Sequence, residues 1–289
     1  MEGTIDILMA KAKAAQSAIE DYTQEEIDQL VRVIGQVVYD NAEMLAREAV
    51  DETGMGVYED KVAKCRGKSQ TIWHNLKDKK SVGIIKEEPE KGLLYVAKPK
   101  GVIAAITPTT NPVVTPMCNA VFALKGRNVI IVAPHPRSKK CSAHTVNLMR
   151  NELKKLGAPE DLIQVIEEPT MELTQELMKA ADVVVATGGM GLVKAAYASG
   201  KPAYGVGAGN VQVIVDRGYD YDQAAKDIIA GRKFDNGIIC SGEQCIIAPK
   251  EDHVAVMAAF EHNGAYYVQD ESTVDKFRKI MFPEGKINS

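Results

Sequence analysis

The chain has 289 residues, of which 45% are hydrophobic and 26% charged, and this balance is typical of a folded protein with room for about two domains. Lysine and arginine number 35 against 39 aspartate and glutamate residues, so the net charge of −4 argues against nucleic-acid and membrane-surface binding. The N-terminus has neither a basic nor an apolar targeting region, and no apolar run approaches the ~20 residues of a membrane span. We therefore expect a soluble, cytoplasmic protein that binds neither nucleic acid nor membrane.

Helices are predicted for most of the first eighty residues. Apolar residues recur at helical spacing over residues 27–38, and Thr23 stands where a capping box would begin this helix. A further helix is predicted over residues 42–51. Residues 81–86 and 93–97 are β-rich and flank a charged turn, which predicts a hairpin or a protruding arm.

From residue 101 onward, short apolar strands alternate with amphipathic helices. The predicted strands cover residues 102–107, 129–133, 162–167, 183–186 and 211–215. The predicted helices cover residues 112–124, 140–156, 173–180, 192–198 and 222–229. This alternation with short connections indicates right-handed βαβ units, and hence an α/β fold with a doubly wound, mostly parallel, Rossmann-like sheet covered on both faces.

The last fifty residues follow a new pattern. A strand is predicted over residues 244–248, a helix over residues 252–261 and a terminal helix over residues 273–280. We interpret this segment as the beginning of a second α/β domain.

Two glycine-rich segments follow apolar runs. The turn at residues 187–191 leads from a strand into a helix, where backbone N–H groups and the helix dipole can face a phosphate, but such turns also occur without any ligand. The cluster at residues 205–210 is either a flexible connector or backbone that lies close to a flat ligand or a reacting centre. The residues alone leave both pairs of alternatives open.

Two further segments follow the first predicted strands of the sheet. Residues 135–140 are basic where a dinucleotide fold often meets the adenosine ribose, so they allow a cofactor with a 2′-phosphate, whereas a solvated basic loop is the alternative. Asn111 precedes Pro112, an arrangement that commonly caps a helix. Alternatively, the Asn111 amide points at an oxyanion.

The five cysteines are scattered and lack metal-ligand spacing, so we expect reduced thiols and no metal site. Cys65, Cys118 and Cys141 fall within helical patterns as small apolar residues, which predicts structural roles. Cys240 differs, because glycines flank it at an apparent domain junction, where a thiol can face a cleft.

Five segments stand in one order along the chain: GVIAAITPTTNP at residues 101–112, NVIIVAPHPRSK at 128–139, ATGGMG at 186–191, YGVGAGN at 204–210 and FDNGIICSGEQ at 234–244. Together they resemble the aldehyde dehydrogenase superfamily. More narrowly, they are similar to its CoA-acylating branch, which includes acetaldehyde and succinate-semialdehyde dehydrogenases and the aldehyde half of bifunctional alcohol/aldehyde enzymes. The resemblance runs over nearly the whole chain.

The resemblance implies an oxidoreductase that converts an aldehyde to an acyl-CoA reversibly, with NAD or NADP as cofactor and coenzyme A as cosubstrate. It makes Cys240 the nucleophile and Asn111 the residue that holds the oxyanion. The dinucleotide is expected to contact residues in four segments, namely Ile106, Thr107, Pro108, His135, Pro136, Arg137, Thr187, Gly188, Gly189, Gly205, Val206 and Gly207. Residues 1–233 are then N-terminal helices plus the dinucleotide-binding domain, and residues 234–289 begin the catalytic domain, which is incomplete.

The stretch at residues 205–209 bears on the fate of the acyl group. Hydrolytic family members have a Glu-Leu-Gly-Gly-Lys block there, whereas this chain has Gly-Val-Gly-Ala-Gly and no carboxylate to activate water. A thiol such as that of CoA needs no strong base for exchange with a thioester, because the leaving thiolate has a similar pKa. Glu243 follows Cys240 by three residues, and we expect it to be structural and not a substitute base.

Family members usually extend well beyond the length of this chain, so the match covers the cofactor region and only the opening of the catalytic domain. Full-length members are expected to form homo-oligomers, and this chain lacks a counterpart of the C-terminal strand that joins a partner's sheet. A nucleotide-binding fragment without turnover is therefore one alternative. A hydrolytic or phosphorylating aldehyde dehydrogenase is another.

Overall fold

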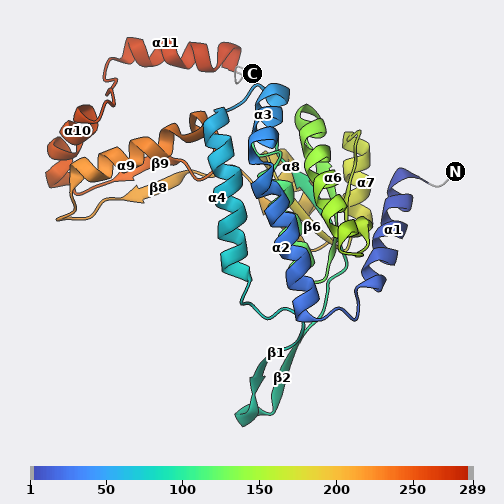
Figure 1. Ribbon diagram of the computed structural model, residues 1–289. Coiled ribbons are helices and arrows are strands. Elements are labelled where there is room, and N and C mark those ends of the chain that lie inside the picture. The colour runs from blue at the N-terminus through green and yellow to red at the C-terminus, as the bar shows by residue number, and fades with distance from the viewer. Residues whose placement is uncertain (1–2, 286–289) are drawn as a thin grey trace. The chain divides into compact units, whose positions relative to one another are not determined.

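A computed structural model describes residues 3–285, and these residues divide into two units (Figure 1). The first unit runs to Gly209 and includes Ile238–Cys240. The second unit comprises Asn210–Gly237 and resumes at Ser241. Within residues 3–285, no helix combines the length and the apolar character needed to cross a membrane.

The first unit begins with α1 (Thr4–Ala18), α2 (Gln24–Asp40), α3 (Ala42–Thr53) and α4 (Tyr58–Leu76). The predicted capping box is confirmed, because the Glu26 N–H donates to Thr23 Oγ1 at 3.3 Å and the Thr23 N–H donates to Glu26 Oε2 at 2.8 Å. Helix α3 ends at Gly54, whose φ of +66° suits a residue without a Cβ atom.

The predicted hairpin is also confirmed. Strands β1 (Gly83–Glu88) and β2 (Leu93–Ala97) pair antiparallel, and they project from the helices of the first unit (Figure 1). Most of the large apolar side chains on both strands are exposed, so the hairpin contributes little to the core.

A parallel sheet with the strand order β5-β4-β3-β6-β7 forms the centre of the first unit. Its strands are β3 (Val102–Thr107), β4 (Val129–Pro134), β5 (Ile163–Val165), β6 (Val183–Thr187) and β7 (Ala203–Val206). Every residue of β3 and β4 is buried, as expected for central strands covered on both faces. The predicted doubly wound, mostly parallel α/β sheet is therefore confirmed.

Helices connect successive strands of this sheet. These are α5 (Val114–Lys125), α6 (Lys139–Lys155), α7 (Met171–Ala180) and α8 (Met190–Tyr197). Because the chain reverses its direction across the sheet after β5, right-handed crossovers put α5 and α6 on one face and α7 and α8 on the other. Helix α2 packs against α5 and α6, and α1 packs against α7 and the sheet.

The second unit contains β8 (Val211–Ile214), α9 (Tyr221–Lys233), β9 (Glu243–Ile247), α10 (His253–His262) and α11 (Glu271–Met281). Strands β8 and β9 pair in parallel, and α10 packs against α9. The buried apolar cluster of the described part of this unit consists of Val215, Ala224 and Ile228.

Two details differ from the sequence-based prediction. The strand at residues 211–215 was expected in the doubly wound sheet, but β8 pairs with β9, so residues 210–237 group with the second unit and the division does not fall after residue 233. Strand β7 was not predicted, because its Ala-Tyr-Gly-Val sequence includes a glycine, which is unfavourable in strands. In both cases pairing with a distant strand decides the structure.

Candidate functional site

The strand order creates a switch point in the first unit. From β3 the chain proceeds to β4 and β5 on one side, then returns to β6 on the other side of β3. In open α/β sheets, ligands bind at the carboxyl ends of the strands beside such a point. Strands β3, β4, β6 and β7 end at Thr107, Pro134, Thr187 and Val206, so the four predicted cofactor segments lie at the same edge of the sheet.

Two buried polar atoms at the carboxyl end of β3 have no partner. Thr107 is 2% exposed, and its Oγ1 atom makes no hydrogen bond with any described residue. The Oδ1 atom of Asn111 is likewise buried without a partner within residues 3–285. Because a buried unsatisfied polar group costs about 1–3 kcal/mol, these atoms fit an edge that is completed by a polar ligand such as a dinucleotide. Ile106 is buried beside Thr107, and Pro108 is half-buried.

Asn111 is not the cap of α5. The helix begins at Val114 with Val113 in the N-cap position, and no side chain caps it. The Asn111 carbonyl oxygen accepts a hydrogen bond from the Thr115 N–H at 3.2 Å, but its side chain makes no such contact. Of the two roles that the sequence left open, capping is therefore wrong, and the amide remains available for another partner.

The turn after β6 combines a packing role with an open helix terminus. A Cβ atom on Gly188 would lie 2.8 Å from Leu192 Cδ2, so the close approach of α8 requires glycine there. Gly189 occupies the N-cap position of α8 without a side-chain hydrogen bond. The first N–H groups of α8 therefore have no capping side chain. Thr187, which precedes this turn at the end of β6, is half-buried.

Gly205 and Gly207 lie against α8. A Cβ atom on Gly205 would lie 2.7 Å from Val193 Cγ1, and one on Gly207 would lie 2.6 Å from Met190 Sδ. The Gly205 N–H also donates to Tyr197 Oη at 3.2 Å. Gly205 therefore belongs to β7, and both glycines permit close packing on this helix, whereas residues 207–210 connect β7 to β8 outside any helix or strand.

The basic segment after β4 is ordered by His135. Its Nδ1 atom accepts a hydrogen bond from the Arg137 N–H at 3.1 Å, and His135 precedes a short helical turn over Pro136–Ser138. Partial burial and the neighbouring Arg137 charge lower the pKa of His135. Lys139 pairs with Glu168, whereas Arg137 is exposed and takes part in none of the ion pairs found within residues 3–285.

Exposure separates Cys240 from the other cysteines. Cys240 is exposed, Cys65 and Cys141 are buried, and Cys118 is half-buried. Burial raises the pKa of Cys118 to about 11, and burial together with Glu48 and Glu52 raises the pKa of Cys141 well above its ordinary range. Because the thiolate is the nucleophile, Cys118 and Cys141 are poorly reactive.

The backbone before Cys240 has an unusual conformation. Asp235, Asn236 and Gly237 have φ angles of +54°, +55° and +70°. Left-handed conformations are costly for residues other than glycine and often occur at functional sites. This run ends immediately before Ile238–Cys240, the segment that belongs to the first unit.

The aldehyde dehydrogenase family model matches residues 2–268. This chain belongs to the aldehyde dehydrogenase family. It is 68% identical over 288 residues to the succinate-semialdehyde dehydrogenase (acetylating) of Clostridium kluyveri, a match that covers 100% of this chain and 64% of the relative. The chain therefore corresponds to the N-terminal part of that relative, at less than two thirds of its length.

Solved structures agree with this assignment. An acetylating aldehyde dehydrogenase from Geobacillus thermoglucosidasius has a TM-score of 0.92 at 40% identity, covering 98% of this chain and 63% of the other. A propionaldehyde dehydrogenase from Rhodopseudomonas palustris, with bound CoA and an acylated cysteine, has a TM-score of 0.83 at 35% identity, covering 96% and 64%. The resemblance to the CoA-acylating branch is thus confirmed.

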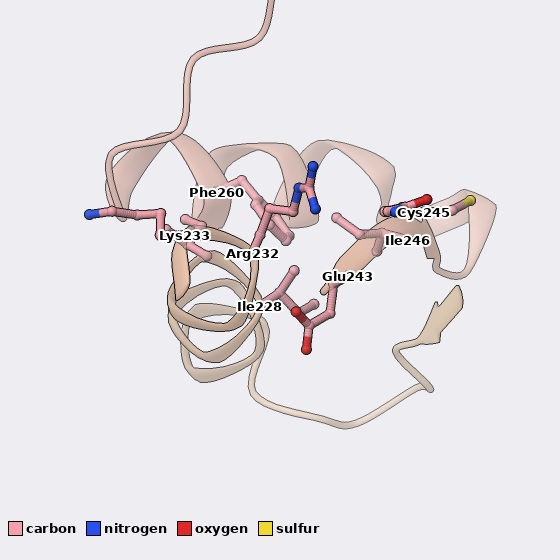
Figure 2. Close-up of a pocket in the computed structure, with 9 residues that line it drawn as sticks. Ile228, Arg232, Lys233, Glu243, Cys245, Ile246 and Phe260 are labelled. Atoms are coloured by element: carbon pink, nitrogen blue, oxygen red, sulfur yellow. The ribbon is translucent and has the colours of Figure 1, made fainter. Parts of the chain in front are cut away.

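Glu243, Lys61 and Lys64 of this aldehyde dehydrogenase chain line two cavities. Glu243 lines a cavity of the second unit (Figure 2), and its Oε2 atom is buried with no partner among the described residues. Lys61 and Lys64 are buried on α4 and line a cavity of about 10 Å³ together with Asn111. Neither burial is predictable from the sequence, because charged residues on a helix are usually exposed and no local signal marks the exceptions.

Proposed function

We propose that this chain carries the nucleophile and the cofactor-binding region of a CoA-acylating, NAD(P)-dependent aldehyde dehydrogenase. The cofactor-binding region, called the cofactor edge below, is the edge of the sheet formed by the carboxyl ends of β3, β4, β6 and β7. The observation that carries the proposal is the exposed thiol of Cys240 in a chain whose other cysteines are buried or half-buried. Relatives that include an acetylating succinate-semialdehyde dehydrogenase and a CoA-bound propionaldehyde dehydrogenase support it. The substrates are then a small aldehyde and CoA.

The first step is addition of the Cys240 thiolate to the aldehyde carbonyl carbon. A carbon–sulfur bond forms, and the carbonyl π electrons move to oxygen as an alkoxide. A donor amide stabilises that charge, and the role falls to Asn111 Nδ2, since the Asn111 side chain does not cap α5.

A bound nicotinamide dinucleotide supplies the acceptor for the hydride that leaves the former aldehyde carbon. The residues that would hold it are those at the carboxyl ends of β3, β4, β6 and β7, where Thr107 Oγ1 lacks a partner among the described residues. The acyl group then remains as a thioester on Cys240. Attack by the CoA thiolate on the thioester carbonyl forms acyl-CoA and returns the Cys240 thiolate.

The choice of CoA over water follows from residues 205–209. This stretch contains no carboxylate, and its first glycines are packed against α8, so it offers no general base for water. Thiol exchange proceeds without one, because the attacking and leaving thiolates have similar basicity.

Arg137 supports a cofactor with a 2′-phosphate, although NAD remains allowed. Its guanidinium group is exposed at the carboxyl end of β4, and residues 134–140 contain no carboxylate. The cysteines form no disulfide within residues 3–285, which supports a reducing, cytoplasmic compartment.

Two measurements test the proposed function. Iodoacetamide followed by mass spectrometry should modify Cys240 before the other cysteines, and preferential labelling elsewhere would contradict the nucleophile assignment. Succinate semialdehyde with NAD or NADP should yield reduced cofactor faster with CoA than without it. Cys240→Ala should abolish this reaction, whereas Cys118→Ala, the matched control, should retain it.

A second candidate function is dinucleotide binding without turnover. The Thr107 Oγ1 atom, buried without a partner among the described residues at the carboxyl end of β3, supports this binding role. Fluorescence titration with reduced NADP distinguishes it: saturable binding without CoA-dependent oxidation of aldehyde would replace the enzymatic proposal by this one.

A further inference from the structure

A cavity of the first unit lies between α2 and α4, which pack side by side (Figure 1). It has a volume of about 280 Å³, and its lining residues come from the second half of each helix. Trp73 in this lining lies more than two turns of α4 beyond Lys64, which lines the smaller cavity with Asn111. The cavity between α2 and α4 is therefore separate from the one beside Asn111.

Ser69 lines this cavity with a polar atom that lacks a partner. The residue is 4% exposed, and its Oγ atom is buried without a hydrogen bond to any residue from 3 to 285. A serine inside a helix can satisfy its hydroxyl on the carbonyl oxygen one turn earlier, but Ser69 makes no such bond. Because an unsatisfied buried hydroxyl is costly, this arrangement indicates a polar ligand in the cavity.

Two aromatic side chains line the same cavity. Tyr39 on α2 and Trp73 on α4 are both half-buried. The guanidinium group of Arg66, which pairs with Glu43, lies 6.0 Å from the centre of the Tyr39 ring. Within the described part of the chain, neither the Tyr39 hydroxyl nor the Trp73 indole N–H makes a hydrogen bond. Both residues therefore offer a ring face and a free polar group to a planar ligand.

The lining of this cavity includes a cationic side chain and no carboxylate. Arg32 is exposed, and its guanidinium group takes part in none of the ion pairs or hydrogen bonds formed among residues 3–285. His74 Nδ1 donates to the Gln70 carbonyl oxygen at 2.8 Å, which leaves His74 Nε2 for another partner. The neighbouring Asp40 carboxylate accepts from the Gln36 amide at 2.8 Å. An anionic group in the cavity therefore finds its charge partner in Arg32.

We propose that the cavity between α2 and α4 binds a planar aromatic ring that carries an anionic group, such as an aromatic carboxylate or a nucleoside monophosphate. The ring stacks on Trp73 and Tyr39, the anion pairs with Arg32, and the Ser69 hydroxyl donates to a polar atom of the ligand. A volume of about 280 Å³ lies just below the range for drug-sized ligands and suits a small one. This site is independent of the reaction proposed for Cys240.

Trp73 makes the test specific, because it is the one tryptophan among the 289 residues. Titration of the full chain with benzoate and with adenosine monophosphate should change the tryptophan fluorescence saturably with at least one probe, and the probe that binds more tightly identifies the carrier of the anion. Adenosine lacks the charge and inorganic phosphate lacks the ring, so each should bind about tenfold more weakly or worse. Cys240→Ala should leave these titrations unchanged, which separates this site from the proposed reaction.

Arg32→Ala should weaken binding of the tighter probe about tenfold, because the anion loses its charge partner. Lys79→Ala is the matched control, since it removes an exposed cation that does not line the cavity, and it should leave the affinity unchanged. Ser69→Ala should weaken binding several-fold, yet raise the melting temperature of the ligand-free chain, because it removes the buried hydroxyl without a partner. Circular dichroism confirms that the variants fold.

Four outcomes would each overturn the proposal. The first is the absence of a saturable fluorescence change with either probe, and the second is equal weakening by Arg32→Ala and Lys79→Ala. The third is an unchanged affinity in Ser69→Ala. The fourth is loss of the fluorescence change in Arg137→Ala, which would place the ligand at the cofactor edge.

Discussion

The two units bury their strands to very different degrees. In the first unit β3 and β4 are buried at every residue, and helices cover both faces of the sheet. In the second unit, every residue of β8 and β9 is half-buried or exposed, and the buried cluster consists of three described side chains. The carboxyl ends of β3, β4, β6 and β7 therefore rest on the large core of the first unit, whereas the described part of the second unit has a small core.

The largest expected effect comes from shortening one buried isoleucine in each unit, which tests the difference in burial between the two units. Ile131→Ala in β4 should lower the free energy of unfolding by about 2–5 kcal/mol, because a fully buried side chain leaves a cavity in a close-packed sheet. Ile228→Ala in α9 should cost less than about 2 kcal/mol, since its cluster is small. Urea unfolding followed by circular dichroism measures both. Equal losses would mean that the second unit is as tightly packed as the first.

Arg137→Ala tests whether the cofactor edge of the first unit binds the 2′-phosphate of NADP. Loss of the guanidinium should weaken NADP binding about tenfold, because a charge-assisted contact to the 2′-phosphate disappears. NAD binding should change little. Fluorescence titration with the two reduced cofactors measures this, and Lys140→Ala is a nearby control. A loss that is equal for both cofactors would assign Arg137 a different role.

Thr107→Val separates ligand binding from packing at the same edge. Valine has nearly the shape of threonine but lacks the hydroxyl that is buried without a partner among the described residues. The variant should be more stable by about 1 kcal/mol without ligand, yet bind the dinucleotide more weakly. Thermal unfolding with and without NADP measures both effects. A variant that is destabilised without ligand would show that the hydroxyl already has a partner.

The smallest expected effect concerns His135. Its pKa is lowered in the folded chain, so folding favours the neutral ring. The stabilisation is present above the unfolded pKa and is lost as the pH falls through the folded pKa. NMR titration should place the His135 pKa below that of an unfolded peptide, and His135→Gln should reduce the acid sensitivity of the first unit. A raised pKa would contradict the Nδ1 hydrogen bond.

Local signals predicted much of the first unit. The Thr23 capping box, the hairpin and the strand over Val102–Thr107 are where hydrophobic periodicity and capping chemistry indicated. The order of the five motif segments also identified the family, and the strand ends bring the cofactor segments to one edge. Each of these features depends on residues close together in the sequence.

Other features depended on contacts between distant residues. Asn111 has the sequence of a helix cap, but α5 begins three residues later, at Val114. The glycine-rich β7 forms because β6 and α8 lie beside it, and β8 joins β9 in another unit.

The sequence by itself determined the kind of element at most positions, the family, and Cys240 as the candidate nucleophile, because periodicity and motif chemistry are local. Only the tertiary structure decided which strands are neighbours, that Cys240 is the exposed thiol, and that Thr107 and Asn111 hold buried polar atoms without a described partner. The physical reason is that pairing and burial are set by packing between segments far apart in the chain, which no local pattern encodes.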